Sequence, residues 1–204
     1  MNCEVHAARM EDLDGVVEAH RSAFPGYFLT ILGPRFLRIF YSAFLEGNAG
    51  TLLVCEQPPG VVVGFVAGTR QPVEFFARLR RRSGLRLAFA ALPAVPRHPC
   101  RVAERFLAAI RYGGDRPGGL PGYWLLSSLG VLAAASRHGT GGALVERFCD
   151  HARQADARGV YLVTDGTEND AALRFYGRRG FVAHAAWMRR DGRRLLLLKR
   201  SFDG

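Results

Sequence analysis

The feature that most constrains this chain is a glycine-rich turn that joins an apolar run to an amphipathic helix. The apolar run, Tyr123–Val131, has the length and composition of a buried strand. Glycines then stand at positions 139, 141 and 142, and apolar residues keep helical spacing up to position 158. Backbone N–H groups at a helix start point outward and the helix dipole adds to them, so such a turn can bind an anion. A dinucleotide-binding pattern would need a glycine where the chain has Leu144. The turn alone leaves open whether it holds a phosphate or only closes a loop.

A second polar pair lies on a short helix predicted over residues 169–179. Asn169 stands at its start, where it can cap the helix, and Tyr176 follows two turns later on nearly the same face. Taken alone, this spacing is typical of a capping asparagine and a core tyrosine. Gly180 ends the helix, and Phe181 begins a new apolar run.

The rest of the chain alternates strand and helix patterns around these two segments. We expect strands over 3–9, 51–56, 61–68 and 160–164, helices from position 12 and over 34–46, and a last hairpin of 181–189 and 193–199 about Asp191-Gly192. Residues 70–121 form a basic stretch with helices predicted over 73–82, 85–92 and 99–112. A length of 204 residues suits one domain that includes this insertion.

The two polar segments, in this order, resemble the GNAT superfamily of N-acetyltransferases. The first family motif is R/Q-x-x-G-x-G/A at a helix start, and residues 136–141 read S-R-H-G-T-G. The second is N-x-x-A-x-x-x-Y-x-x-x-G-F, which the chain matches without a break from position 169 to position 181. There are two departures. Ser136 replaces the first Arg or Gln, and the strand before the turn has no carboxylate to act as a base.

The resemblance covers residues 3–68 and 123–200 and implies an α+β fold in one domain, residues 1–204. We expect a mixed, mostly antiparallel central sheet of about seven strands that opens near Val131 and is flanked by helices. The basic helical insertion, residues 70–121, would lie between the third and fourth strands.

The resemblance also implies an acetyl-CoA site. The pyrophosphate would lie on the turn and the pantetheine arm along the preceding strand, where the N–H of Val131 or Leu132 would polarise the thioester carbonyl. Tyr176 would protonate the departing thiolate. The expected acetyl-CoA-binding residues are Leu129, Val131, Leu132, Ser136, Arg137, His138, Gly139, Thr140, Gly141, Gly142, Asn169 and Tyr176. The base stays open between a water held by Ser127 or Ser128, the other two catalytic candidates, and a carboxylate such as Asp165.

The amino-acid composition shows a large excess of arginine over lysine. The chain has 27 Arg, a single Lys, Lys199, and a net charge of +10. One late Lys with no glycine-rich loop before it excludes a P-loop nucleotide site and a pyridoxal Schiff base. Residues 70–121 hold 11 Arg and three acidic residues, and so carry eight of the ten net charges. This concentration suits an anionic acceptor such as a nucleotide-linked amino sugar, an anionic membrane surface, or only a solvated basic face.

The remaining signals point to a cytoplasmic protein. Four cysteines without C-x-x-C spacing, scattered histidines and a polar N-terminus predict free thiols, no metal site and no signal peptide. No apolar run is long enough to span a membrane. We therefore expect an acetyl-CoA-dependent N-acetyltransferase with a small-molecule amine acceptor, such as an amino sugar, and no nucleic acid partner. Peripheral membrane contact through the insertion and a homodimer stay open. The alternatives are a catalytically silent acyl-CoA-binding module and a basic protein that binds nucleic acid or a membrane surface.

Overall fold

One seven-stranded sheet organises the molecule. The computed structural model describes residues 4–57, 60–96, 120–136, 138–167, 169–189 and 192–202. The strand order is β1-β2-β3-β4-β5-β7-β6, and every neighbouring pair is antiparallel except β4 and β5. The strands are β1 (Glu4–Ala7), β2 (Gly50–Glu56), β3 (Val62–Thr69), β4 (Tyr123–Val131), β5 (Gly159–Asp165), β6 (Val182–Met188) and β7 (Arg194–Ser201). The predicted mixed, mostly antiparallel α+β fold is confirmed.

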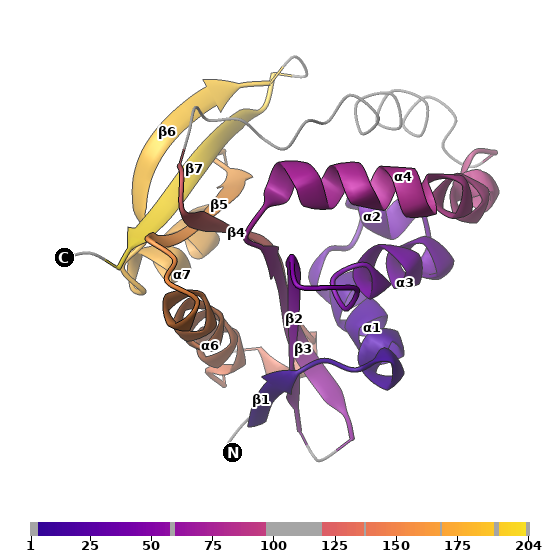
Figure 1. Cartoon of the computed structure of the whole chain (residues 1–204), viewed down its shortest axis with the longest axis horizontal. Helices are drawn as coiled ribbons and strands as arrows, with labels where there is room; N and C mark the ends of the chain where they lie inside the picture. The colour runs from indigo at the N-terminus through magenta and orange to yellow at the C-terminus, as the bar shows by residue number, and fades with distance from the viewer. Residues whose placement is uncertain are drawn as a thin grey trace.

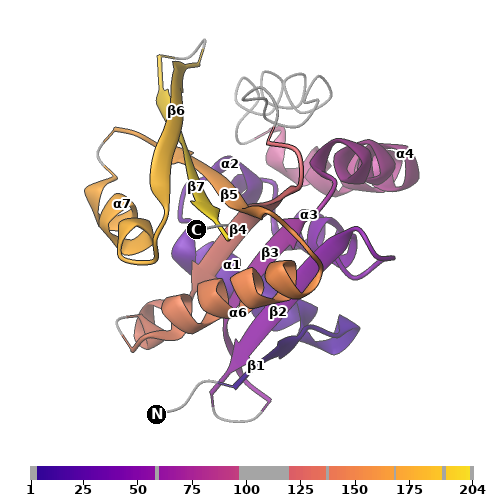
Figure 2. The same cartoon turned by 60° about the vertical axis from the view of Figure 1, so that its left-hand side comes forward.

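Helices cover both faces of this sheet (Figures 1 and 2). One face carries α1 (Leu13–Ala23), α2 (Phe28–Ile31), α3 (Pro34–Ser42) and α4 (Pro72–Ala91), and the other carries α6 (Thr140–Gln154) and α7 (Asp170–Gly177). Short 3-10 turns lie at Met10–Asp12, Leu92–Ala94 and Ala133–Ala135. The sequence did not predict α2, whose single turn is too short to show a helical period.

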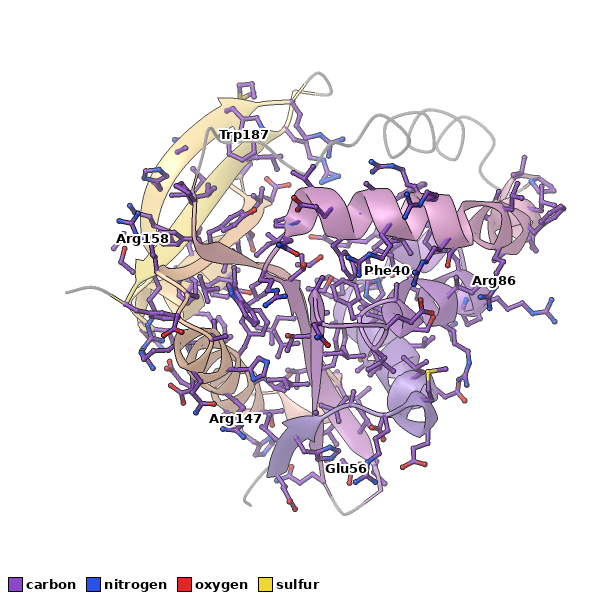
Figure 3. All side chains as sticks on the ribbon, viewed as in Figure 1. Phe40, Glu56, Arg86, Arg147, Arg158 and Trp187 are labelled. Atoms are coloured by element: carbon purple, nitrogen blue, oxygen red, sulfur yellow. The ribbon has the colours of Figure 1, made fainter. Side chains whose placement is uncertain are left out.

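The two faces of the sheet build two separate cores. On the α1 and α3 side, Leu37, Tyr41 and Phe65 are completely buried, and Phe40 lies in the packed region beneath α4 (Figure 3). On the α6 side, the core includes Phe148. Every residue of β3 is buried, because this strand has helices on both faces. Double-sided burial explains why its sequence is a continuous apolar run rather than an alternating one.

The part of the insertion that the structure describes is one long helix, and the prediction of two pieces over 73–82 and 85–92 is wrong. Buried side chains recur about every fourth residue of α4, and α4 packs against α3. A glycine in a helix interior costs about 1 kcal/mol relative to alanine. Burial along α4 outweighs that cost at Gly84, so the helix runs through it. The helix predicted over 99–112 lies outside the described residues.

The sheet opens earlier than predicted. β4 and β5 pair only through Tyr123, Trp124 and Leu125, whereas β4 stays paired with β3 up to Val131. The strands therefore separate after Leu125 and not near Val131. A β-bulge follows at once: Ala67 pairs with Ser128 and Gly68 with Leu126, which leaves Ser127 as an extra residue. Bulges bend a strand and increase its twist, which favours this divergence.

Two cysteines differ in their state, and one of them differs from the prediction. Cys149 is a free, buried thiol, as predicted, and burial raises its pKa to about 12. Cys55 is disulfide-bonded, so the expectation of a free thiol is wrong there. In the described part of the chain, no helix has the length and apolar character needed to cross a bilayer.

Candidate active site

A cavity of about 520 Å³ lies where β4 and β5 separate. Its walls come from the outer half of β4, the end of β5, one face of α7, the loop after α1, and the end of the β6–β7 hairpin. The lining residues are Phe24, Tyr27, Leu126, Ser127, Ser128, Leu129, Val131, Gly141, Leu162, Val163, Thr164, Asp165, Asn169, Ala172, Phe175, Tyr176, Arg189, Arg193 and Leu195. The opening between the strands is thus a cavity lined by both polar and apolar side chains.

Beyond Leu125, the edge of β4 toward β5 has no strand partner among the described residues. The Leu132 N–H donates to the Val63 carbonyl, 2.8 Å away, so it points toward β3. Consecutive N–H groups of a strand point to opposite edges, so those of Val131 and Leu129 point toward the gap. Of the two backbone amides considered for polarising the thioester carbonyl, the Val131 N–H points toward the gap, as this role requires. The Leu132 N–H is already hydrogen-bonded to β3.

The glycine-rich turn after β4 forms the start of α6. Gly139 has φ of 83°, a left-handed conformation that suits glycine, and it precedes the first helical residue, Thr140. The Ser136 hydroxyl donates to the Leu132 carbonyl, 3.3 Å away. Thr140 Oγ1 is buried and has no hydrogen-bond partner among the described residues. Ser136, His138 and Gly139 are exposed, and Arg137 lies outside the described residues.

Helix α7 packs directly on this turn. A Cβ at Gly142 would stand 2.2 Å from Arg179 Nη2, and one at Gly141 would stand 3.4 Å from Phe175 Cζ. The Arg179 guanidinium lies 3.9 Å above the centre of the Phe175 ring and donates to the Phe175 carbonyl at 2.8 Å. A cation is therefore fixed beside the first turn of α6. Sequence reasoning missed Arg179, because only the tertiary contact with Gly142 shows its position.

Tyr176 is buried and also lines the cavity. Its ring contacts Phe175 and Phe181 edge-on at 5.0 and 5.5 Å between centroids. Burial raises the pKa of its phenol well above the usual range, and the charge of Arg179 opposes this only in part. Tyr176 is therefore protonated at any physiological pH and can act as a proton donor.

Asn169 reaches the site in a different role from the predicted one. It occupies the N-cap position of α7, but its side chain makes no capping hydrogen bond. Instead Nδ2 donates to Thr164 Oγ1 at 2.7 Å and to the Asp165 carbonyl at 3.1 Å. Asn169 therefore ties α7 to the end of β5, on the wall opposite β4.

The candidate bases differ in the interactions that their side chains make. Asp165 is engaged on both carboxylate oxygens, by the Thr167 N–H at 3.0 Å and by Arg193 at 3.4 Å. Ser127, the bulge residue, and Ser128 both line the cavity. Burial raises the pKa of the Tyr41 phenol on α3 above its usual range, and the nearby Ser128 side chain opposes this in part.

The far end of the cavity, beyond β5, is polar and cationic. Arg189 and Arg193, near the β6–β7 turn, enter its lining together with Asp165. Phe24 and Tyr27, from the loop after α1, also line the cavity, with their rings 5.5 Å apart and edge-to-face. No local sequence pattern indicated Phe24, Tyr27, Arg189 or Arg193, because only the folded chain brings them to one cavity. The described residues contain no group of three or more His, Cys, Asp or Glu side chains that could hold a metal ion.

The sheet is thus forked between β4 and β5, and a glycine-rich turn and a buried tyrosine stand at the fork. Residues 13–181 match the family model of the acetyltransferase (GNAT) family. The chain belongs to this family. It is therefore an acetyltransferase that uses acetyl-CoA.

Solved structures of low sequence identity share the fold. The ribosomal-protein-S18-alanine N-acetyltransferase of Escherichia coli is 14% identical, with a TM-score of 0.59 over 100% of this chain and 96% of its own. The ribosomal-protein-alanine N-acetyltransferase of Brucella melitensis is 15% identical, with a TM-score of 0.63 over 98% and 99%. A protein assigned as a streptothricin acetyltransferase from Bacillus anthracis, solved with acetyl coenzyme A, is 13% identical, with a TM-score of 0.52 over 80% and 68%. Curated protein sequences give no match to the chain.

Proposed function

We propose that this enzyme transfers the acetyl group of acetyl-CoA directly to the amine of a small anionic acceptor. The observation that carries the proposal is the single cavity that brings together the β4 edge, Tyr176 and a cationic far end. Neither Ser127 nor Ser128 has a histidine within hydrogen-bonding distance among the described residues, so an acyl-serine route lacks its base.

The turn and the β4 edge fit the donor. The pyrophosphate would lie at the start of α6, where outward N–H groups and the helix dipole favour an anion and Arg179 adds a fixed positive charge. This cation compensates for Ser136, which stands where the family pattern has Arg or Gln. The pantetheine arm would pair with the free edge of β4 at Leu129 and Val131, and the Val131 N–H would polarise the thioester carbonyl.

Tyr176 supplies the proton that the leaving group needs. The amine lone pair forms the C–N bond, and the electron pair of the breaking C–S bond goes to sulfur. The Tyr176 hydroxyl protonates that thiolate, and the nitrogen releases its extra proton to solvent, from which the phenol is reprotonated. Its buried position supports this role, because it keeps the phenol neutral until the thiolate develops.

The far end of the cavity supports an anionic acceptor. Guanidinium groups bind phosphate and carboxylate in two-pronged geometry, and Arg189 and Arg193 both enter this end. Phe24 and Tyr27 offer rings to a sugar or a base. An amino sugar linked to a nucleotide carries all three features: an amine, a ring and phosphates. We therefore propose an amino sugar or nucleotide-linked amino sugar as the acceptor.

A second contact, with a membrane surface, is supported by the outer face of α4. Leu85, Phe89 and Leu92 stand on one stripe and are 79%, 69% and 56% exposed. The neighbouring Arg81, Arg82 and Arg86 are exposed as well, and Arg86 lies toward the end of α4 that is far from the sheet (Figure 3). Apolar residues bordered by cations suit an anionic bilayer surface. Sedimentation with phosphatidylglycerol vesicles would test this contact. Binding that is lost in a triple Leu85→Ser, Phe89→Ser, Leu92→Ser variant would support it, and equal binding by both proteins would contradict it.

The reaction itself is tested by CoA release on a panel of amines. The panel would hold nucleotide-linked amino sugars, free amino sugars, peptides and streptothricin-type amines. Turnover is expected with an amine that bears a phosphate, and a variant with Arg189→Gln and Arg193→Gln should raise its KM more than that of a neutral amine. Tight acetyl-CoA binding without turnover on any amine would favour the silent acyl-CoA-binding module. Turnover only with neutral amines or peptides would overturn the acceptor class.

A further inference from the structure

Asp165 is the one carboxylate among the described residues that line the cavity. It is the last residue of β5, on the arm of the fork that faces β4. The described lining also holds no histidine and no cysteine. An acceptor amine is an ammonium ion in neutral water and must lose a proton before its nitrogen can attack. Asp165 is therefore the side chain of this lining best suited to take that proton.

The side chain of Asp165 lies on the opposite face of the sheet from Tyr176. Successive side chains of a strand alternate between the two faces, and β5 pairs with β7 without a register shift. Leu162 belongs to the core on the α6 side, which also holds Tyr176. Tyr161 lies in the small core against which Phe76 of α4 packs, and Asp165 follows it by four residues on the same face. The cavity thus has a proton donor on one face and a carboxylate on the other.

The Asp165 carboxylate is fixed in place and can still accept further hydrogen bonds. Oδ1 accepts from the Thr167 N–H at 3.0 Å, and Oδ2 accepts from Arg193 at 3.4 Å. Asn169 Nδ2 donates to the Asp165 backbone carbonyl at 3.1 Å and so holds the end of β5. A carboxylate has about four lone-pair directions, so one hydrogen bond on each oxygen leaves room for another. The side chain is 24% exposed, so a ligand in the cavity can reach it.

We propose that Asp165 binds the ammonium group of the acceptor and takes one of its protons, so that a neutral amine attacks the thioester. This inference rests on the proposed amine acetylation. It favours Asp165 over a water held by Ser127 or Ser128, because a carboxylate attracts an ammonium ion and a hydroxyl does not. The amine then approaches from the face opposite Tyr176, which meets the sulfur from the other side.

The ammonium group loses two protons during the reaction. The first goes to Asp165, and the neutral nitrogen then forms the C–N bond while the C–S bond breaks. The second leaves the nitrogen for solvent once the C–N bond has formed. Sulfur takes the hydroxyl proton of Tyr176, which solvent replaces, and Asp165 gives its proton to solvent. The amide, the thiol of CoA and one net proton are released.

Asp165→Asn tests the charge without disturbing the loop. The new side-chain oxygen can still accept from the Thr167 N–H. On the panel amine that the wild-type enzyme acetylates fastest, kcat/KM should fall about 100-fold near neutral pH, with the KM for acetyl-CoA unchanged. Asp165→Ser, whose hydroxyl can also accept from this N–H, should lose as much. Asp170→Asn is the matched control and should behave as wild type, because Asp170 is exposed at the start of α7 and does not line the cavity.

The pH profile separates a base from a residue that only holds Arg193. Between pH 6 and the pKa of the amine, wild-type kcat/KM should be nearly flat, because the proton that leaves the nitrogen stays in the site on Asp165. In Asp165→Asn only an amine that arrives neutral can react, so kcat/KM should rise about tenfold per pH unit. The other charged or titratable groups that face this cavity are Arg189, Arg193, Tyr27 and Tyr176, and guanidinium groups and phenols ordinarily titrate above this range. Arg193→Gln should raise the KM for the amine and keep the flat profile.

The outcomes separate this inference from the function on which it rests. A wild-type enzyme that acetylates no amine would overturn both. If the wild type turns over, an unchanged kcat/KM in Asp165→Asn, or a loss that keeps the flat profile, would overturn the role of Asp165 and leave the proposed reaction in place. A steep profile in Arg193→Gln as well would show that Asp165 acts only by holding Arg193.

Discussion

At the residue scale, the packing role of Tyr176 and its proposed role as proton donor can be separated by experiment. Tyr176 belongs to the core on the α6 side of the sheet and also lines the cavity. Tyr176→Phe keeps the ring and removes only the proton donor. We expect kcat to fall about 100-fold, within the range for general acid catalysis, while the melting temperature and the Kd for acetyl-CoA stay unchanged. Wild-type kcat with chemistry rate-limiting, judged by single-turnover rates, would remove Tyr176 as the acid.

Gly142 sets the contact between the acetyl-CoA turn and Arg179. Gly142→Ala adds a methyl group 2.2 Å from Arg179 Nη2 and must displace the guanidinium. We expect the Kd for acetyl-CoA to rise about tenfold, which corresponds to about 1.4 kcal/mol. Gly177→Ala is the matched control, because nothing lies within 4 Å of its added Cβ. Equal affinity of both variants by calorimetry would show that Arg179 does not contribute to donor binding.

At the element scale, local sequence patterns predicted most of the strands and helices. β4 and α6 appear where an apolar run meets helical spacing, and the last hairpin forms about Gly192. Local sequence patterns give wrong predictions where tertiary contacts determine the structure. Packing against α3 stabilises α4, so the helix stays continuous across Gly84. The short pairing of β4 with β5 is accompanied by a β-bulge between β4 and β3, and the sequence of one strand does not predict such a bulge.

The same limit applies to the site. The glycine-rich turn and Tyr176 each belong to a local motif, so the sequence alone made them candidates, and Gly141 and Tyr176 line the same cavity. Phe24 and Arg193 come from distant segments, and only the folded chain brings them to the cavity. Asn169 stands at the predicted N-cap position of α7, but its side chain makes no capping hydrogen bond and donates to Thr164 on β5.

The continuity of α4 leads to a stability prediction. Gly84 lies inside the helix, and nothing lies within 4 Å of an added Cβ. Gly84→Ala should therefore raise the free energy of unfolding by about 0.5–1 kcal/mol, measured by urea denaturation, with activity unchanged. A loss of stability would mean that α4 is not a continuous helix at this position.

At the scale of the whole molecule, His20 links stability to pH. Its folded pKa, about 4, lies below the usual value of 6.5, so the unfolded chain binds a proton that the folded chain refuses. Stability is full above pH 6.5 and falls as the pH drops toward 4, by up to about 3 kcal/mol from this group. His20→Asn should flatten the difference between unfolding free energies at pH 7 and pH 4.5. An unchanged pH slope in that variant would contradict the burial of a neutral His20.

We propose for the whole molecule that acetyl-CoA and an amine meet in one cavity and react without an acetyl-enzyme intermediate. Mass spectrometry of the amine and of the protein, after incubation with acetyl-CoA and a nucleotide-linked amino sugar, tests this most directly. We expect one added acetyl group on the amine and none on the protein at any time during turnover. An acetylated protein that passes its acetyl group to the amine, or an unmodified amine beside intact acetyl-CoA, would contradict it.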